Sequence, residues 1–239
     1  MTPAIFAVRN SLRRLVSRST FCGLVLVLLS AANSPAAFVF TGNSSDGHAV
    51  SGSAAFTLND ALDTVTVVLT NTTTTTLDAG ELFTGLDFRI GGLATSMTSD
   101  MGIQRTVAAN GTYSDTLTLQ DLSWSLVSLG SGNYQLNFNP DAKDSILGPP
   151  SGGNYAGANG SIKGNNGHNP FAAQTATFQL SVPGLTSGTK VGVTTFRYGT
   201  ELEPATGTIT PEPACCLLFA TGGVGALLFR RRTCTKAVG

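Results

Sequence analysis

The stretch Ala54–Thr70, AAFTLNDALDTVTVVLT, decides the fold class. In its second half an extended strand would place Val65, Val67 and Leu69 on one face, with Thr64, Thr66 and Thr70 on the other. The letters NDALD between the two halves supply the Asn and Asp that tight turns favour. The sequence therefore predicts a β-hairpin.

The same kind of short, β-rich run recurs through residues 37–209, and no part of this range shows sustained apolar residues at helical spacing. We therefore expect an all-β body, a β-sandwich or jelly roll, in which the lone Trp124 belongs to the core. Residues 148–170 are too rich in Gly and Asn for a strand or a helix. We expect them to form a disordered loop; the alternative is a ligand surface that includes Tyr155 and His168. The predicted runs are GSAAFTLND, DTVTVVLTNT, LFTGLDFRI, GTYSDTLTL, SWSLVSL, NYQLNFN, QTATFQLSV and KVGVTTFRYGT.

Charge and cysteine content exclude two classes of function for this body. The chain is neutral overall, but only six of its fourteen basic residues lie between the two apolar runs, together with all fourteen acidic ones, which leaves a net charge of −8 there. Nucleic-acid binding needs a basic surface, so we expect no nucleic-acid partner. The body contains no cysteine, which excludes a thiol nucleophile or a cysteine-based metal site.

Residues 1–36 have the layout of a secretory signal peptide. Four arginines precede the apolar run FCGLVLVLL, Phe21–Leu29, and small residues then offer cleavage after Ala32 or Ala36. The nine residues of the run are too few to cross a hydrocarbon layer about 30 Å thick. We expect the export machinery to remove this segment; the alternative is an uncleaved anchor.

A second apolar run, residues 214–229, carries no charge and is followed by Arg230, Arg231 and Arg232. As a helix its sixteen residues would reach about 24 Å, a short span that arginines at one end and local bilayer thinning can accommodate. The three arginines mark the cytoplasmic side, which leaves the body outside. A buried terminal helix is the alternative, but the run has no polar face.

Residues 210–236 resemble the PEP-CTERM sorting signal in the order Pro211-Glu212-Pro213, apolar span and arginine cluster. The resemblance implies processing by an exosortase, a membrane-embedded enzyme of bacteria that make extracellular polysaccharide. The three motif residues would be recognised, and the span would hold the protein in the inner membrane until processing. The Cys215-Cys216 pair and the long tail after Arg232 depart from the usual pattern. Independently of the resemblance, the two prolines favour an extended segment that a membrane protease could grip.

The body is also similar to a group of small exosortase-dependent surface proteins, in the opening Gly47–Leu58 and in the element Tyr198–Pro204. A looser match ends at Thr72. This resemblance implies one β domain without known catalysis.

Residues able to carry catalysis are few. The chain has two histidines, His48 and His168, and lacks a G-x-S-x-G nucleophile elbow and a histidine- or cysteine-based zinc motif. Asp46, His48 and Ser51 lie close in the sequence, but a triad is assembled in space. Three pairs of carboxylates could offer oxygen ligands to calcium, although turn carboxylates explain them more simply: Asp60 with Asp63, Asp141 with Asp144, and Glu201 with Glu203. We expect no enzyme activity, no cofactor and no metal.

Three functions follow for testing. The first is a non-enzymatic protein of the cell surface or extracellular matrix, sorted by the C-terminal signal. The second is a carbohydrate-binding β-sandwich that holds exopolysaccharide, and the third is a secreted hydrolase in which a histidine meets carboxylates in a pocket. The second requires exposed aromatic side chains in a shallow groove around the four tyrosines Tyr113, Tyr134, Tyr155 and Tyr198.

Overall fold

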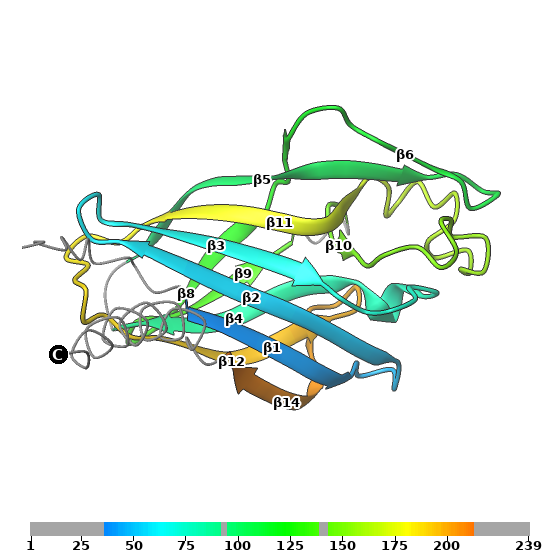
Figure 1. Cartoon of the computed structure of the whole chain (residues 1–239). Coiled ribbons are helices and arrows are strands. Elements are labelled where there is room, and N and C mark those ends of the chain that lie inside the picture. The colour runs from blue at the N-terminus through cyan, green and yellow to red at the C-terminus, as the bar shows by residue number, and fades with distance from the viewer. Residues whose placement is uncertain (1–35, 92–94, 139–142, 213–239) are drawn as a thin grey trace, which may run out of the picture. The chain divides into compact units, whose positions relative to one another are not determined.

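The computed structural model describes residues 36–91, 95–138 and 143–212 (Figure 1). All of them belong to a unit that begins at Asn33. The other unit, Met1–Ala32, lies outside the described residues. The described elements are strands and one 3₁₀ turn, η1: β1 (Ala36–Asn43), β2 (Ala49–Asn59), β3 (Thr64–Asn71), η1 (Ala79–Glu81), β4 (Phe83–Ile90), β5 (Ser96–Val107), β6 (Tyr113–Asp115), β7 (Gln120–Asp121), β8 (Ser125–Gly130), β9 (Asn133–Asn137), β10 (Ile146–Leu147), β11 (Phe171–Ser181), β12 (Val191–Tyr198), β13 (Glu203–Pro204) and β14 (Thr206–Pro211).

The predicted hairpin is present as β2 and β3, which pair in antiparallel register from Gly52↔Asn71 to Asn59↔Thr64. Val65, Val67 and Leu69 are fully buried, as their alternation predicts. Asp63 closes the turn in a left-handed conformation, and its side chain accepts hydrogen bonds from the amides of Gly184 and Leu185. The turn is therefore tied to the segment that follows β11.

The strands form one hydrogen-bonded network of 14 strands, whose main path is β13-β12-β4-β10-β11-β3-β2-β1-β14. The short pair β10–β11 is parallel and the other named pairs are antiparallel. Strands β5, β11, β3 and β2 follow one another in one layer (Figure 1). The path folds back, because Phe40 of β1 stacks on Phe196 of β12 with ring centroids 5.2 Å apart. The all-β prediction is confirmed, and the arrangement is consistent with a β-sandwich.

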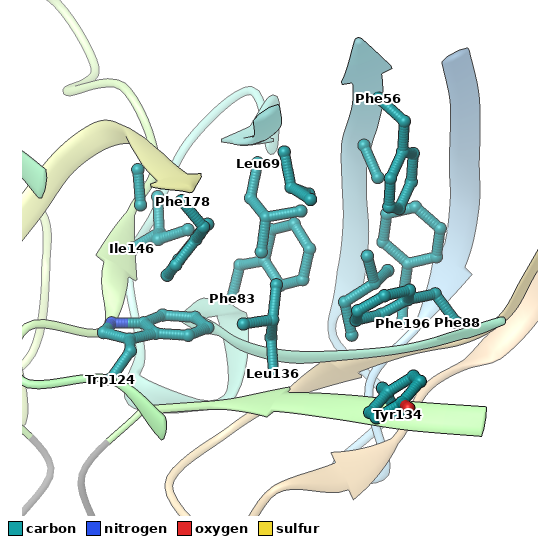
Figure 2. Close-up of a cluster of buried hydrophobic side chains, with 14 of the residues drawn as sticks. Phe56, Leu69, Phe83, Phe88, Trp124, Tyr134, Leu136, Ile146, Phe178 and Phe196 are labelled. Carbon is teal, nitrogen blue, oxygen red and sulfur yellow. The ribbon is translucent and has the colours of Figure 1, made fainter. Parts of the chain in front are cut away.

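The main core lies where side chains of these layers meet (Figure 2). Phe83 and Phe88 come from β4, Phe178 comes from β11, and each of these rings is at most 1% exposed. Trp124 packs against Phe178 with centroids 5.1 Å apart, and it is 5% exposed. The expectation that Trp124 belongs to the core is confirmed.

The Gly/Asn-rich segment 148–170 contradicts our expectation of disorder. It forms a series of turns around a second buried cluster, to which it contributes Tyr155, Ala158 and Ile162. Backbone hydrogen bonds attach it to the loop that follows β5, for example from the Tyr155 amide to Gly111 O at 2.8 Å. The segment is therefore ordered without a strand or a helix, because three of its apolar side chains are buried and its backbone is hydrogen-bonded.

Among the described residues no helix is long and apolar enough to cross a membrane. The predicted span 214–229 lies outside them, as does the signal peptide except for its last residue, Ala36.

Candidate functional site

The first two residues of the predicted sorting motif, Pro211 and Glu212, lie at the end of β14, a strand at one edge of the sheet. Pro211 is paired with Phe38 of β1, and the Glu212 amide donates a hydrogen bond to Ala37 O at 2.8 Å. Both motif residues are exposed. The extended conformation that the prolines predict is confirmed for these two residues, and the neighbouring strand supports it.

Pro211 occupies a position in the ladder where its missing N–H costs nothing. Because Glu212 bonds to Ala37, the preceding pair Pro211↔Phe38 is one of the alternate pairs that exchange no hydrogen bonds. The Pro211 nitrogen therefore faces the free edge of β14, away from β1. Proline is tolerated at such edge positions, and it removes a donor from an edge that could otherwise pair with another strand.

Strand β1, which holds β14, is anchored in the core by two aromatic rings. Phe38 meets Phe56 edge to face with centroids 6.0 Å apart, and Phe40 stacks on Phe196 at 5.2 Å. Strand β14 has no comparable anchor, since its residues are exposed apart from the half-buried Ile209. The position of β14 therefore depends on its pairing with β1.

A glycine pair allows β1 and β14 to approach each other closely. Gly42 and Gly207 face each other in the register. A Cβ on Gly207 would lie 2.3 Å from Thr41 O, and one on Gly42 would lie 2.2 Å from Thr206 O. The ring of Phe40 lies against the same pair, 2.8 Å from either added carbon. A side chain at either glycine would force the two strands apart.

The remaining parts of the predicted signal, Pro213, residues 214–229 and Arg230–Arg232, lie outside the described residues. The structure nevertheless brings the two ends of the body together. Strand β1 starts at Ala36, where the predicted signal peptide ends, and it is the antiparallel neighbour of the strand that ends at Pro211. Strand β14 runs two residues beyond the predicted end of the body at 209.

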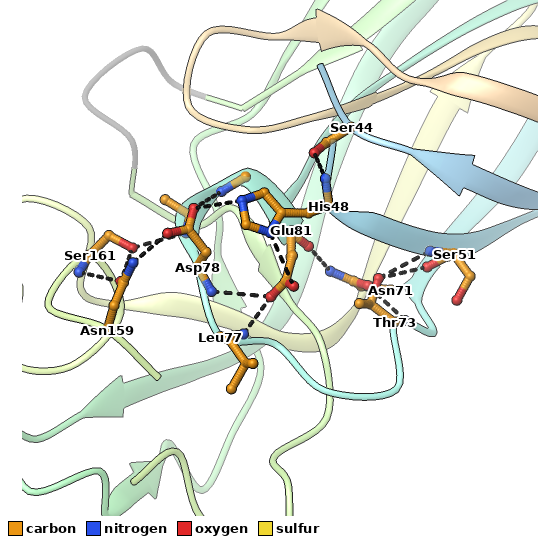
Figure 3. Close-up of polar contacts among 12 residues, drawn as sticks. Ser44, His48, Ser51, Asn71, Thr73, Leu77, Asp78, Glu81, Asn159 and Ser161 are labelled. Atoms are coloured by element: carbon orange, nitrogen blue, oxygen red, sulfur yellow. Dashed lines mark hydrogen bonds and ion pairs between the residues drawn. The ribbon is translucent and has the colours of Figure 1, made fainter. Parts of the chain in front are cut away.

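His48 is the histidine that approaches carboxylates (Figure 3). Its Nε2 lies 3.8 Å from Asp78 Oδ1, and its Nδ1 lies 3.8 Å from Glu81 Oε1. Both carboxylates already have structural partners. Glu81 accepts from the amides of Leu77 and Asp78, and Asp78 accepts from the Gly80 amide at 2.8 Å. Together they form a capping box at η1.

In the part of the chain that the structure describes, no hydroxyl is hydrogen-bonded to the His48 ring. Ser44 accepts a hydrogen bond from the backbone amide of His48 and not from its ring. Ser51 is engaged with Thr72 and Thr73. Within the described residues Asp46, His48 and Ser51 therefore do not assemble into a triad. His168 lies in the 148–170 segment, where its Nδ1 contacts Ser161 O at 2.7 Å.

The carboxylates that the sequence offered as calcium ligands have other surroundings where the structure describes them. Asp63 serves the turn between β2 and β3, and Asp141 lies outside the described residues. Glu201 and Glu203 line a polar hollow of about 270 Å³ together with Asp46. In the described part of the chain no three His, Cys, Asp or Glu side chains are grouped so that they could hold a metal ion.

The four tyrosines do not form the exposed groove that the carbohydrate-binding alternative requires. Tyr134, Tyr155 and Tyr198 are at most 5% exposed, and Tyr113 is 38% exposed. The ring of Tyr113 is covered on one face by the guanidinium of Arg105, 4.0 Å from the ring centroid. Three of these rings are therefore core residues, and a single partly covered ring is left at the surface.

The chain matches no protein-family model, and no curated protein is significantly similar to it. Its function is therefore argued from the geometry and from the sequence signals.

The sequence reasoning missed a group of buried carboxylates beside Trp124. The Asp100 carboxylate accepts a hydrogen bond from the backbone amide of Trp124. The indole Nε1 of Trp124 donates a hydrogen bond of 2.9 Å to the backbone carbonyl oxygen of Asp144. Burial raises the pKa of Asp144 to about 6, and the charges of Asp100 and Asp121 add to the effect. Burial likewise raises the pKa of Asp100. No pattern in the sequence indicates this cluster, because its members come from distant segments.

Proposed function

We propose that the chain is an exported, non-enzymatic protein of the cell surface or extracellular matrix. The export machinery removes residues 1–36, and the span 214–229 holds the protein in the inner membrane with a β-sandwich body outside. An exosortase then reads Pro211-Glu212-Pro213 and processes the chain, with Arg230–Arg232 on the cytoplasmic side. The final site is the cell surface or the matrix.

The observation that carries this proposal is the position of the motif at the end of the body. The described strands fill the interval between the two predicted hydrophobic segments, from Ala36 to Pro211. Glu212 follows directly, exposed and extended, and it is the second residue before the apolar run. If residues 214–229 formed a helix buried against the body, the body would need a surface that covers it. A sorting substrate instead needs a motif that the enzyme can reach, and Glu212 is exposed.

The non-enzymatic assignment is supported by the surroundings of His48. The two carboxylates beside its ring, those of Asp78 and Glu81, form the capping box of η1. The nearby hydroxyls of Ser44 and Ser51 form hydrogen bonds with groups other than this ring. In a triad a carboxylate orients the histidine from within hydrogen-bond reach, and the 3.8 Å between the His48 ring and each carboxylate exceed that reach. The hydrolase alternative is therefore the least supported of the three.

The alternative function is a β-sandwich that binds extracellular polysaccharide and is delivered by the same route. Stacking of sugar rings on the protein would need exposed aromatic side chains, and the burial of Tyr134, Tyr155 and Tyr198 removes three of the four candidates. The body therefore serves in sorting and surface display.

The intact mass of the protein recovered from its native host tests the proposal, with a strain that lacks the exosortase as the control. We expect a mature form that begins near Asn33 or Ala37 and ends near Pro213 only where the enzyme is present. A C-terminus that keeps Arg230–Arg232 in both strains would make residues 214–229 a plain membrane anchor and would refute processing.

A further inference from the structure

The outer edge of β14 is the surface that the proposed enzyme would meet first. Within the described residues β14 pairs with β1 alone, so its other side carries no strand. Thr208 and Thr210 are exposed on this strand, and Pro211 and Glu212 end it. Because side chains alternate along a strand, Pro211 shares the face of Phe38, and Glu212 lies on the opposite face beside the small Ala37. The Glu212 carboxylate is therefore left uncovered.

The chain length to the apolar run places this edge at the membrane. Pro213 alone separates Glu212 from Ala214, and one residue spans at most about 3.5 Å. If residues 214–229 span the bilayer, as the proposed function requires, the end of β14 is held at its surface. The partner that fits this edge is thus a membrane-embedded peptidase that binds an extended segment from its free side.

We propose that the processing enzyme docks on the outer edge of β14 and reads Pro211 and Glu212 while β14 is still paired with β1. The folded body then presents the motif as a strand that is already extended. The Glu212–Ala37 hydrogen bond and the prolines have fixed the backbone before the enzyme binds, so binding does not have to order it. This inference rests on the proposed function, and it adds that folding of the body precedes sorting.

Two variants of the full-length chain separate a paired motif from a free one. The first locks the strands: Thr41 and Thr208 face each other in the register on exposed positions, so Thr41→Cys with Thr208→Cys places a disulfide across them. The second inserts six Gly/Ser residues between Thr210 and Pro211, which leaves β14 paired but moves the motif away from β1. Single Thr208→Cys is the matched control, and Cys215 and Cys216 are replaced by Ser throughout.

The readout is the fraction of the chain that has lost Arg230–Arg232 at a fixed time in the native host, measured by intact mass. We expect the locked variant to be processed at the rate of the control, with and without reductant. We expect the spacer variant to be processed at least tenfold more slowly, although its body resists protease like that of the control. Rapid processing of the spacer variant would overturn the inference, as would a locked variant that needs reductant.

Glu212→Ala distinguishes failure of this inference from failure of the proposed function. If this variant is not processed but the spacer variant is, the motif is read as a free peptide; the proposed function then stands and the inference falls. If Glu212→Ala is processed normally, both fall. Disulfide-linked dimers of the single Thr208→Cys control would show a second copy on this edge and would also overturn the inference.

Discussion

Arg105 and Tyr155 lie fifty residues apart in the chain and are joined by a buried hydrogen bond of 2.9 Å, from the guanidinium Nη1 to the phenolic oxygen. The same guanidinium donates two hydrogen bonds of 2.7 Å to Asp115, and the Tyr155 hydroxyl donates to Gly148 O at 2.7 Å. Burial lowers the pKa of Arg105, but its bonds to Asp115 and Tyr155 outweigh burial and raise it. Arg105 thus connects strand β5 with the 148–170 segment.

Replacement of Arg105 should loosen this segment. We expect Arg105→Ala to lower the free energy of unfolding by about 2–4 kcal/mol, because it leaves a partly buried carboxylate and a buried hydroxyl without their donor. Arg105→Lys keeps the charge but loses the two-pronged geometry, so about half of that loss is expected. Chemical denaturation measures the free energy of unfolding of each variant. Hydrogen exchange at the Tyr155 amide shows where the effect lies, and unchanged exchange there in Arg105→Ala would contradict the assignment.

The buried Asp144 should make the body more stable in mild acid than its composition suggests. Its pKa of about 6 in the fold exceeds the ordinary value of about 3.9, so between these pH values the native state holds a proton that the unfolded chain has lost. Stability from this group therefore falls as the pH rises from about 4 to about 6. Burial is the main cause of the raised pKa, and the charges of Asp100 and Asp121 add to it, whereas the hydrogen bond of 2.8 Å from the Gln104 amide and the charge of Lys143 act against it.

We therefore expect Asp144→Asn to raise the free energy of unfolding at pH 7.5 by about 1–3 kcal/mol and to leave it nearly unchanged at pH 4. Denaturation curves across this range provide the measurement. Asp60→Asn, at an exposed turn, is the control and should change stability little at either pH. A loss of stability at pH 7.5 in Asp144→Asn would mean that the carboxylate acts as a charged acceptor for Gln104.

The close contact of Gly42 and Gly207 predicts a local effect. Gly207→Val would place a carbon 2.3 Å from Thr41 O and 2.8 Å from the Phe40 ring, so β14 must move off β1. We expect faster hydrogen exchange and protease cleavage at residues 206–212, and a loss of only about 1–3 kcal/mol in global stability. Thr208→Val, at an exposed position of the same strand, is the control. Wild-type protection of residues 206–212 in Gly207→Val would show that the pair tolerates a side chain.

The strands that could be predicted from the sequence are those that bury only one of their two faces. The hairpin β2–β3 was found because Val65, Val67 and Leu69 are fully buried, whereas their neighbours on the other face of β3 are half-buried. Strand β5 was missed because it turns polar residues inward: Asp100 and Arg105 are each 7% exposed, which breaks the apolar period. Its stability comes from partners in distant segments, and a period within one strand cannot reveal them.

Strand β14 and the 148–170 segment were missed for a different reason. The segment TGTITP buries little of its own surface, and its place depends on the free edge of β1 and on the glycine pair. In the Gly/Asn-rich segment the buried residues Tyr155 and Ile162 are sparse, so composition hid them. The extended form of Pro211-Glu212 could be predicted, because proline limits the backbone locally. The pairing of β14 with β1 could not be predicted, because the two strands lie at opposite ends of the body's sequence.

Tyr198 and Gly52 should be energetically coupled across the core. The Tyr198 ring is fully buried and stacks on Phe83 at 5.1 Å, and its hydroxyl finds no hydrogen-bond partner among the described residues. Burial raises the pKa of this hydroxyl, so it stays neutral. A Cβ on Gly52 would lie 2.4 Å from the Tyr198 oxygen. Gly52 thus provides the space in which the hydroxyl fits.

A double-mutant cycle measures this coupling. Tyr198→Phe removes an unpaired buried hydroxyl and should raise the free energy of unfolding by about 1 kcal/mol. Gly52→Ala should lower it by about 1–3 kcal/mol in the wild type, because the added carbon meets the hydroxyl. In the Tyr198→Phe background this loss should shrink by at least about 0.5–1 kcal/mol, since only Thr70 O at 3.1 Å and Phe83 at 3.3 Å remain close. Strictly additive effects in chemical denaturation would mean that the Tyr198 hydroxyl moves aside at no cost. Gly52 would then be required by its close approach to the backbone of β3 and not by Tyr198.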